Sequence, residues 1–391
     1  MAEGIWKGLT QDELREVVLD IKDKIHGESS LDWEDICFKH NLDIHSDSLR
    51  KASSGVALME AAGMDQDRLT HKIESGAAKA IRASANEAFR TMSRSEAMRD
   101  LIKDAASKLR PYELDSPTPI RYSEDRSLVL VVADPHYGAE WEVHGLNGEV
   151  INAYSPEIFE QRMIDLLDQA ITIIEREEIS HVHVMLAGDA LDGMLRPSQL
   201  MHLKYGVIES TMRFAEFFAA WLWKLSSYAV IDAWFVPGNH GEIRPLGSKK
   251  GDFADENAER IIPWWIKERL SNSKRVEIHC TDSKMQLIDI HGYNFVLDHG
   301  DEKNKIEDVC KQSMLLYGMP IHFYVCGHLH RRNDIPTGCT PDGNTYFLRV
   351  PSIAGMDKYA QSLQYGGKAG ASAYVIERKY GLRCSYPILL K

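Results

Sequence analysis

The chain lacks the long apolar runs of membrane proteins, because no segment reaches about 18 uncharged apolar residues in a row. Residues 1–10 also lack the basic flank and apolar stretch of a signal peptide. The six cysteines show neither close pairing nor metal-type spacing, so we expect reduced thiols rather than a disulfide framework. These absences predict a cytoplasmic protein of 391 residues with no membrane partner.

The chain also lacks an excess of basic over acidic residues. Asp and Glu outnumber Lys and Arg by 58 to 46, which leaves a net charge of −12. Proteins that coat duplex nucleic acid usually carry a basic surface, so composition alone does not favour that role. Residues 50–110 form a mildly basic region with twelve Lys or Arg and eight Asp or Glu. We interpret it as a solvated helical linker, with a nucleic-acid arm as the less favoured alternative.

The chain divides by pattern into three parts. Residues 1–62 contain three short helices whose order resembles a helix-turn-helix module, with residues 46–52 opening the third helix. DNA binding and a docking role are about equally favoured for this module. Residues 63–120 are a polar, alanine-rich helical linker that could pair protomers in a homodimer. In residues 121–391 strands and helices alternate, which predicts an α/β domain.

Ligand-type side chains follow five predicted strands, at the point where each strand ends. These strands, at residues 127–133, 181–187, 229–236, 293–298 and 321–326, end in Asp134-Pro135-His136, Gly188-Asp189, Gly238-Asn239-His240, Asp298-His299 and Gly327-His328-Leu329-His330. Strand carboxyl ends converge on one crevice of an open sheet, so we expect these side chains to share a centre. Each motif alone is weak, but five in this order are hard to explain by chance.

This series resembles the calcineurin-like metallophosphoesterase family, whose pattern is D-x-H, G-D, G-N-H, H and G-H-x-H, over about residues 127–355. The resemblance implies a metallophosphoesterase β-sandwich flanked by helices in four αββα layers, preceded here by a small all-α domain. It also implies which residues hold two metal ions. One ion would be held by Asp134, His136, Asp189 and His330, and the second by Asp189, Asn239, His299 and His328, with Asp189 bridging.

The ligand types favour particular ions and a particular reaction. Carboxylate, imidazole and amide ligands suit two divalent transition-metal ions, Mn²⁺ by preference, with Fe or Zn²⁺ as alternatives. In this family a hydroxide bridging the ions would attack a phosphoester whose oxygens the ions hold. His240 has the position of the family's catalytic histidine and would contact the phosphate or protonate the leaving oxygen. A purely orienting role for His240 is the alternative.

One loop narrows the resemblance further. The stretch from Gly188 to Ser198 is similar to the G-D-x-x-x…R-P-S loop of DNA-repair exonucleases of the SbcD type. Those nucleases usually carry a histidine where Asp192 stands here, and they add a capping domain after the last motif, for which this chain has no room. Arg196 in this loop and Arg331 after the last motif are candidate substrate-phosphate contacts.

Three functions are weighed. The preferred hypothesis is a metal-dependent DNA nuclease or phosphodiesterase that grips DNA with its N-terminal helices. The alternative is a phosphatase or phosphodiesterase for a small nucleotide or a phosphoprotein, favoured by the net charge and the missing capping domain. The third, a binding protein with a vestigial site, is disfavoured because every ligand of the motif series is present. Four further histidines on or beside strands are interpreted as structural: His181, His183, His279 and His291.

Overall fold

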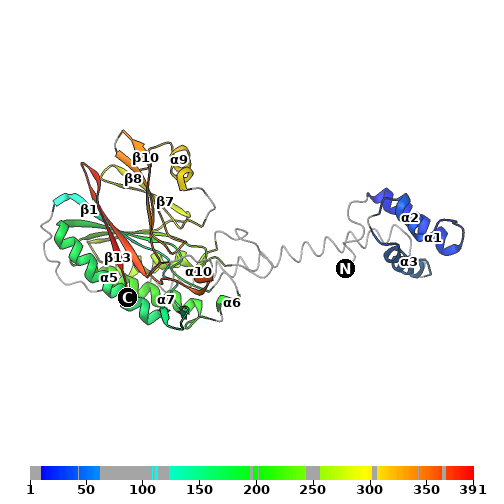
Figure 1. Ribbon diagram of the computed structural model, residues 1–391, viewed down its shortest axis with the longest axis horizontal. Helices are drawn as coiled ribbons and strands as arrows, with labels where there is room; N and C mark the ends of the chain where they lie inside the picture. Colours follow the sequence, from blue (N-terminus) through cyan, green and yellow to red (C-terminus); the bar gives the residue numbers. More distant parts are fainter. Residues whose placement is uncertain are drawn as a thin grey trace. The chain divides into compact units, whose positions relative to one another are not determined.

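The computed structural model describes residues 10–42, 44–61, 108, 111–112, 123–193, 197–200, 202–243, 256–301, 306–341, 343–362 and 367–391. The chain forms two compact units, residues 1–90 and residues 91–391 (Figure 1). The predicted linker, residues 63–120, lies almost wholly outside the described residues. The three-part division of the chain therefore stays a prediction.

The described part of the first unit has three helices, where the sequence predicts three. They are α1 (Gln11–His26), α2 (Trp33–Lys39) and α3 (Ser46–Ala61). The first begins at a capping box, in which Thr10 and Glu13 each bond the other's backbone N–H. Buried Ile21, Ile36 and Leu49, one from each helix, form a shared apolar core. The unit is thus held together by its own core, and its identity as a helix-turn-helix module stays a prediction.

The second unit is built on two sheets. The larger sheet has the order β13-β12-β1-β4-β5-β6. Its strands are β1 (Ser123–Val132), β4 (Ile179–Ala187), β5 (Val230–Val236), β6 (Val276–His279), β12 (Gly370–Glu377) and β13 (Gly381–Leu389). Strands β1, β4, β5 and β6 run parallel, so their carboxyl ends lie at one edge.

The smaller sheet has the order β10-β11-β9-β8-β7. Its strands are β7 (Met285–Ile290), β8 (Tyr293–Asp298), β9 (Phe323–Cys326), β10 (Asn333–Thr340) and β11 (Gly343–Arg349). Strands β8, β9 and β11 are parallel neighbours. A separate hairpin pairs β2 (Trp141–His144) with β3 (Val150–Tyr154).

Helices cover the outer faces of both sheets. They are α5 (Pro156–Glu177), α7 (Val207–Leu225), α8 (Ile261–Arg269) and α9 (Ile306–Tyr317). Shorter elements of this unit are α6 (Pro197–Leu200), the 3₁₀ turn η1 (Ala258–Arg260) and α10 (Lys358–Ser362). Leu130 of β1 packs in the core beneath α5 and α7, whereas the next residue, Val131, packs between the sheets. Helix α9 covers the smaller sheet on its other side (Figure 1). The layers are therefore helix, sheet, sheet and helix, as predicted for this part of the chain.

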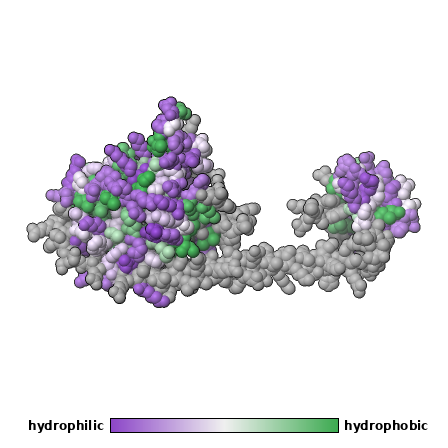
Figure 2. All heavy atoms as spheres, turned by 90° about the horizontal axis from the view of Figure 1, so that it is seen from below, coloured by the Kyte–Doolittle hydropathy of each residue, from purple (hydrophilic) through white to green (hydrophobic). Residues whose placement is uncertain are grey.

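The surface of the described residues is mixed in character. On the face of the larger unit drawn in Figure 2, hydrophobic residues form separate small areas among hydrophilic ones. Among the described residues, no helix is both long enough and apolar enough to cross a membrane.

Candidate metal centre and active site

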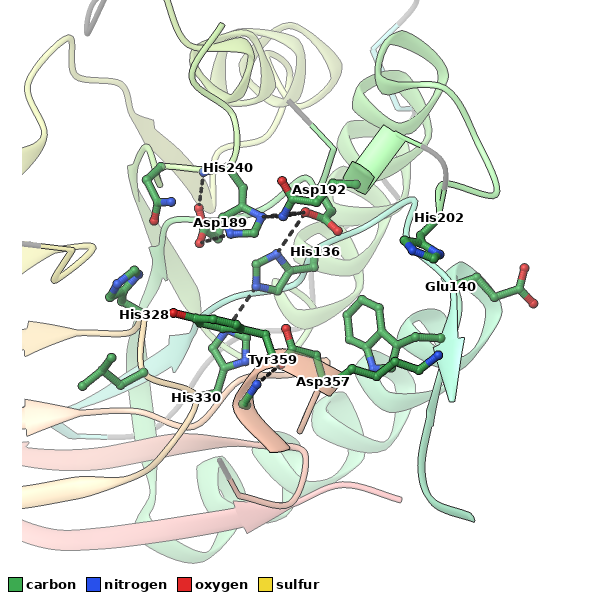
Figure 3. Close-up of a pocket in the computed structure, with 16 residues that line it drawn as sticks. His136, Glu140, Asp189, Asp192, His202, His240, His328, His330, Asp357 and Tyr359 are labelled. Carbon is green, nitrogen blue, oxygen red and sulfur yellow. Dashed lines mark hydrogen bonds and ion pairs between the residues drawn. The ribbon is translucent and has the colours of Figure 1, made fainter. Parts of the chain in front are cut away.

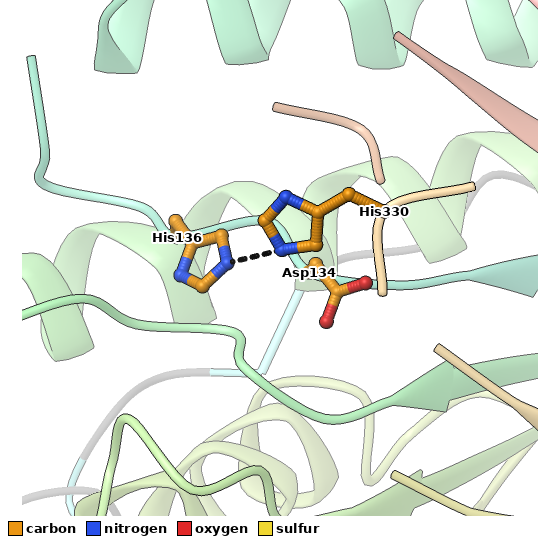
Figure 4. A group of neighbouring side chains, drawn as sticks. All are labelled: Asp134, His136 and His330. Atoms are coloured by element: carbon orange, nitrogen blue, oxygen red, sulfur yellow. Dashed lines mark hydrogen bonds between the residues drawn. The ribbon is translucent and has the colours of Figure 1, made fainter. Parts of the chain in front are cut away.

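Two groups of ligand-type side chains lie at the carboxyl ends of the parallel strands. In the first, Asp134 after β1 meets His136 and His330, and the Nε2 atoms of the two histidines are 3.1 Å apart (Figure 4). The three side chains are at most 9% exposed. The structure thus brings together residues that are 194 positions apart in the chain, as the motif series predicts.

The second group is built around His299, which follows β8. Its Nε2 atom lies 3.1 Å from an oxygen of Asp189, 3.0 Å from the side-chain oxygen of Asn239 and 3.1 Å from Nδ1 of His328. The Nδ1 atom of His299 is 2.9 Å from the carbonyl oxygen of Ala187, which fixes the ring orientation. Asp189 therefore joins this group directly, while its bridging role between two ions stays a prediction.

The backbone is unusual at the same residues. Five of the eight described non-glycine residues with positive φ belong to the motif series: Asp134, His136, Asp189, His328 and His330. Each such residue costs on the order of 1–3 kcal/mol, and strain of this kind gathers at functional sites. Gly238 is required by close packing, because a Cβ there would lie 2.1 Å from both the backbone nitrogen and Oδ1 of Asp189. The loops are thus shaped to aim these side chains, at a cost in stability.

The side chains of both groups fit metal ions. A tetrahedral ion with bonds of 2.0–2.1 Å separates its ligands by roughly 3.3 Å, close to the contacts of His299. In the first group the Nε2 atoms of His136 and His330 face each other over 3.1 Å. The buried Nδ1 atoms of both rings have no hydrogen-bond partner among the described residues. A cation between the rings and Asp134 would occupy this arrangement of donors.

Burial leaves two of the imidazole ligands in the neutral state that binds metals. It lowers the pKa of His136 to about 3 and that of His328 to about 4, so both imidazoles are neutral at pH 7. Burial raises the pKa of Asp134, against the opposing effect of His330 and His299. A buried carboxylate is costly without a cation beside it, so a bound ion would stabilise the charged form of Asp134.

His240 is held by a carboxylate that the motif series does not contain. Its Nδ1 atom is 2.6 Å from Oδ1 of Asp192, and Gln199 donates to the same oxygen over 3.2 Å. Burial alone would lower the pKa of His240, but Asp189 and the bond to Asp192 raise it to about 9. Asp192 thus fixes the ring of His240 and favours its protonated form, a role that the sequence motifs did not indicate.

Glu259 is a second residue that sequence reasoning missed. It lies in η1, is 5% exposed, and accepts hydrogen bonds from the backbone of Gly238 over 2.8 Å and of Leu191 over 3.3 Å. These two residues belong to the loops that carry Asn239 and Asp189. Glu259 therefore ties two ligand loops together. No sequence motif surrounds it, and only the fold brings it beneath the site.

Both groups face a cavity of about 490 Å³ (Figure 3). Its walls include Trp141 of β2 and, from the segment around α10, Asp357, Lys358 and Tyr359. Trp141 donates to the carbonyl oxygen of Met356 over 3.3 Å, which links the two walls. The described lining contains one lysine and no arginine beside its histidines and carboxylates. The cavity thus combines aromatic walls with a ligand-rich floor.

The two predicted arginine contacts have different outcomes. Arg196 lies outside the described residues, so its predicted role is untested. Arg331 is half-buried beside His330 but does not occur among the described residues that line the cavity. Its contact with a substrate phosphate stays a prediction.

Comparison with known proteins gives one curated relative. No protein-family profile matches the chain. The SPbeta prophage-derived uncharacterized protein YonJ of Bacillus subtilis is 28% identical over 319 residues, which cover 80% of this chain and 76% of that protein. Its description names no activity.

Similar solved structures include phosphoesterases by name and Vps29 proteins. A dimetal phosphatase from Danio rerio has a TM-score of 0.34 and 12% identity, covering 68% of this chain and 99% of that one. Vps29 from Entamoeba histolytica, complexed with Zn²⁺, has a TM-score of 0.28 and 13% identity, covering 66% and 98%. A metallophosphoesterase from Sphaerobacter thermophilus has a TM-score of 0.31 and 11% identity, covering 68% and 89%. TM-scores below 0.5 do not establish a common fold, so function must be inferred from the site itself.

Proposed function

We propose that the chain is a two-metal phosphoester hydrolase of the calcineurin-like type. The observation that carries this proposal is the convergence of two neighbouring ligand groups on one cavity: Asp134, His136 and His330 in the first, and Asp189, Asn239, His299 and His328 in the second. When bound, two divalent ions supply Lewis-acid stabilisation of the phosphate oxygens and lower the pKa of the attacking water. Mn²⁺ is the proposed ion, with Fe or Zn²⁺ as alternatives.

The chain's own residues supply the remaining parts of such a reaction. His240 reaches the cavity with a side chain that is 19% exposed, and its Nε2 atom is directed away from Asp192. In the protonated form it would donate a hydrogen bond to the phosphate or a proton to the leaving oxygen. Asp192 and Gln199 hold the ring in place during that transfer. Catalysis by a positioned acid of this kind contributes about 10²–10⁴-fold in rate.

DNA is the proposed substrate, and the first unit is its proposed binding module. Support comes from the helix order of that unit and from exposed Lys51 at the start of α3. The neighbouring Arg50 pairs with Asp47 over 3.1 Å, and a phosphate could replace this exposed partner. The nuclease proposal thus depends on the N-terminal helical unit as much as on the cavity.

A compact nucleotide is the second candidate substrate, and the cavity favours it. A volume of about 490 Å³ is in the range of small-ligand sites. Trp141 and Tyr359 offer aromatic faces on which a base could stack. One lysine in the described lining offers little attraction for an extended polyanion, although two bound ions would add positive charge.

The deciding experiment uses the full-length protein with Mn²⁺ and three substrates: end-labelled single-stranded DNA, end-labelled double-stranded DNA and bis(p-nitrophenyl) phosphate. His240→Ala is the paired variant, expected to bind metal normally and to lose at least about 100-fold in turnover. DNA cleavage that disappears in the variant supports the nuclease. Hydrolysis of the small diester without DNA cleavage selects the nucleotide candidate. A wild-type protein that binds Mn²⁺ and cleaves none of the three contradicts the proposed function.

A further inference from the structure

A second histidine cluster lies on the larger sheet, away from the cavity. His181 and His183 stand on β4, Asp232 on the adjacent β5 and His279 on β6. Side chains two residues apart on a strand share a face, so His181 and His183 share the face of Met185, which packs between the sheets. His183 precedes Asp189 by six residues, roughly 20 Å of extended strand. The cluster is therefore separate from the candidate active site.

The carboxylate of Asp232 is the centre of this cluster. Its Oδ2 atom is 2.5 Å from Nε2 of His181 and 3.8 Å from Nδ1 of His183. Its Oδ1 atom is 2.8 Å from Nε2 of His279. The ligand atoms of His181, His183 and Asp232 all lie within 4.8 Å of one another. Three imidazoles, two from β4 and one from β6, thus gather around a single carboxylate on β5.

His183 is not satisfied by this arrangement. Its side chain is nine-tenths buried, and its Nδ1 atom has no hydrogen-bond partner among the described residues, because 3.8 Å is too long for a hydrogen bond. A buried nitrogen left in this state costs about 1–3 kcal/mol. Burial lowers the pKa of His183 to about 3, with His181 acting in the same direction, so the ring is neutral at pH 7. A neutral imidazole directed at a carboxylate is suited to receive a cation between them.

We propose that His181, His183 and Asp232 form a separate binding site for a zinc-type divalent ion. Two imidazoles and a carboxylate are a common protein ligand set for Zn²⁺, with water completing four-coordination. The side chain of His181 is 37% exposed, which opens the site to solvent for that water and for entry of the ion. His279 holds the other oxygen of Asp232 and would orient the carboxylate towards the ion.

The position of the site indicates a structural role. Its ligands come from β4 and β5, neighbouring parallel strands in which His183 stands opposite Asp232. An ion bound there would cross-link the two strands near the ends opposite their catalytic loops. Asp189 follows β4 and Asn239 follows β5, so the cross-link would brace the strands that carry ligands of the candidate active site.

The test counts Zn²⁺ on the full-length protein by isothermal titration and by elemental analysis after gel filtration. His183→Asn removes a ligand and is expected to bind one Zn²⁺ fewer than the wild type. His279→Asn keeps the three ligands and is expected to retain the site with about 10- to 100-fold weaker affinity. His144→Asn is the matched control, since it removes an exposed histidine 3.7 Å from Glu142, outside the cluster.

The comparison is independent of the active site, because the difference between wild type and variant is counted whether or not the other centre binds Zn²⁺. His181→Asn serves as a second ligand variant, since its partly exposed side chain is removed with less risk to the fold. Circular dichroism establishes that each variant is folded. A loss of one Zn²⁺ in a folded ligand variant, with none in His144→Asn, supports the site. Equal Zn²⁺ counts in the wild type and the folded ligand variants overturn it.

Discussion

Replacing Asp192 with asparagine tests how the candidate active site positions His240. The substitution keeps the size of the side chain but removes the negative charge of the carboxylate, whose oxygen accepts a hydrogen bond from Nδ1 of His240 over 2.6 Å. A hydrogen bond to a charged partner contributes about 1.5–3 kcal/mol. If that contribution is made fully in the transition state, kcat falls about 10- to 150-fold, since 1.36 kcal/mol corresponds to tenfold in rate.

The assay measures kcat and KM for bis(p-nitrophenyl) phosphate with saturating Mn²⁺, together with the number of bound metal ions. Asp192 lies 4.0 Å from Nδ1 of His136 and clusters with His136 and His240, outside the two motif-derived ligand groups. If it only positions His240, the metal count should stay unchanged. KM should change little, because the expected loss is that of an interaction which His240, held by Asp192, makes in the transition state. Asp192→Glu restores a carboxylate and should recover part of the lost activity.

The control is Glu140→Gln, which removes a carboxylate from the same cavity wall. If general loss of negative charge caused the effect, both variants would lose activity alike. Two results would refute the reasoning. One is an Asp192→Asn variant that keeps more than half of the wild-type kcat with a full metal count. The other is a variant that loses a metal ion, which would make Asp192 a ligand rather than a positioning residue.

Three further predictions concern the support and occupancy of the site. Gly238→Ala should lower the free energy of unfolding by about 1–3 kcal/mol and reduce metal binding, because the added Cβ would collide with Asp189. Gly206→Ala is the control: a Cβ there meets open space, so neither quantity should change. Denaturant titration measures the stability and metal titration measures the binding. Scanning calorimetry should give a Tm about 5 °C lower in a chelator than with metal present at 100 times its Kd, because metal binding stabilises only the folded state. An unchanged Tm argues against bound ions. In chelator, Glu259 should make stability fall as pH rises through about 7, because burial, reinforced by Asp189, raises its pKa from 4.5 to about 7. The contribution of Glu259 to the free energy of unfolding is full below about pH 4.5 and is lost as the pH rises through about 7, a decrease of up to about 3 kcal/mol. Denaturant titrations from pH 4 to 8 should therefore show a smaller decrease in Glu259→Gln than in the wild type.

The sequence predicts the interior of the larger unit well. The run from Leu128 to Val132 is apolar at every position because both faces of β1 are covered, and such runs identify buried parallel strands. Strand β10 was not predicted, since it lies at the sheet edge and contains Pro336, which is typical of non-strand segments. Edge strands take their pairing from the neighbouring strand, and no local pattern records that neighbour.

The same distinction holds for the site. Residues such as Asp189 and His330 could be found because a short motif with glycine marks the end of a strand. Asp192 and Glu259 could not be assigned roles in this way, since their partners lie 48 and 21 residues away and contact them only after folding. Asp192 is informative in a further respect, because the sequence marked it only as a departure from the loop of SbcD-type exonucleases, whereas in the structure its carboxylate holds the ring of His240.

The strand histidines show why a residue interpreted as structural needs its neighbours before its role is settled. Alternation along β4 correctly places His181 and His183 on one face, but it does not record that β5 presents Asp232 beside them. A lone histidine between sheets would be expected to donate to a carbonyl or a water. Here Asp232 already binds two other imidazoles, which leaves Nδ1 of His183 directed at the carboxylate over 3.8 Å without a hydrogen bond. A cation bound between His183 and Asp232 would satisfy that nitrogen, whereas a third hydrogen bond to Asp232 would require the ring to approach by nearly 1 Å.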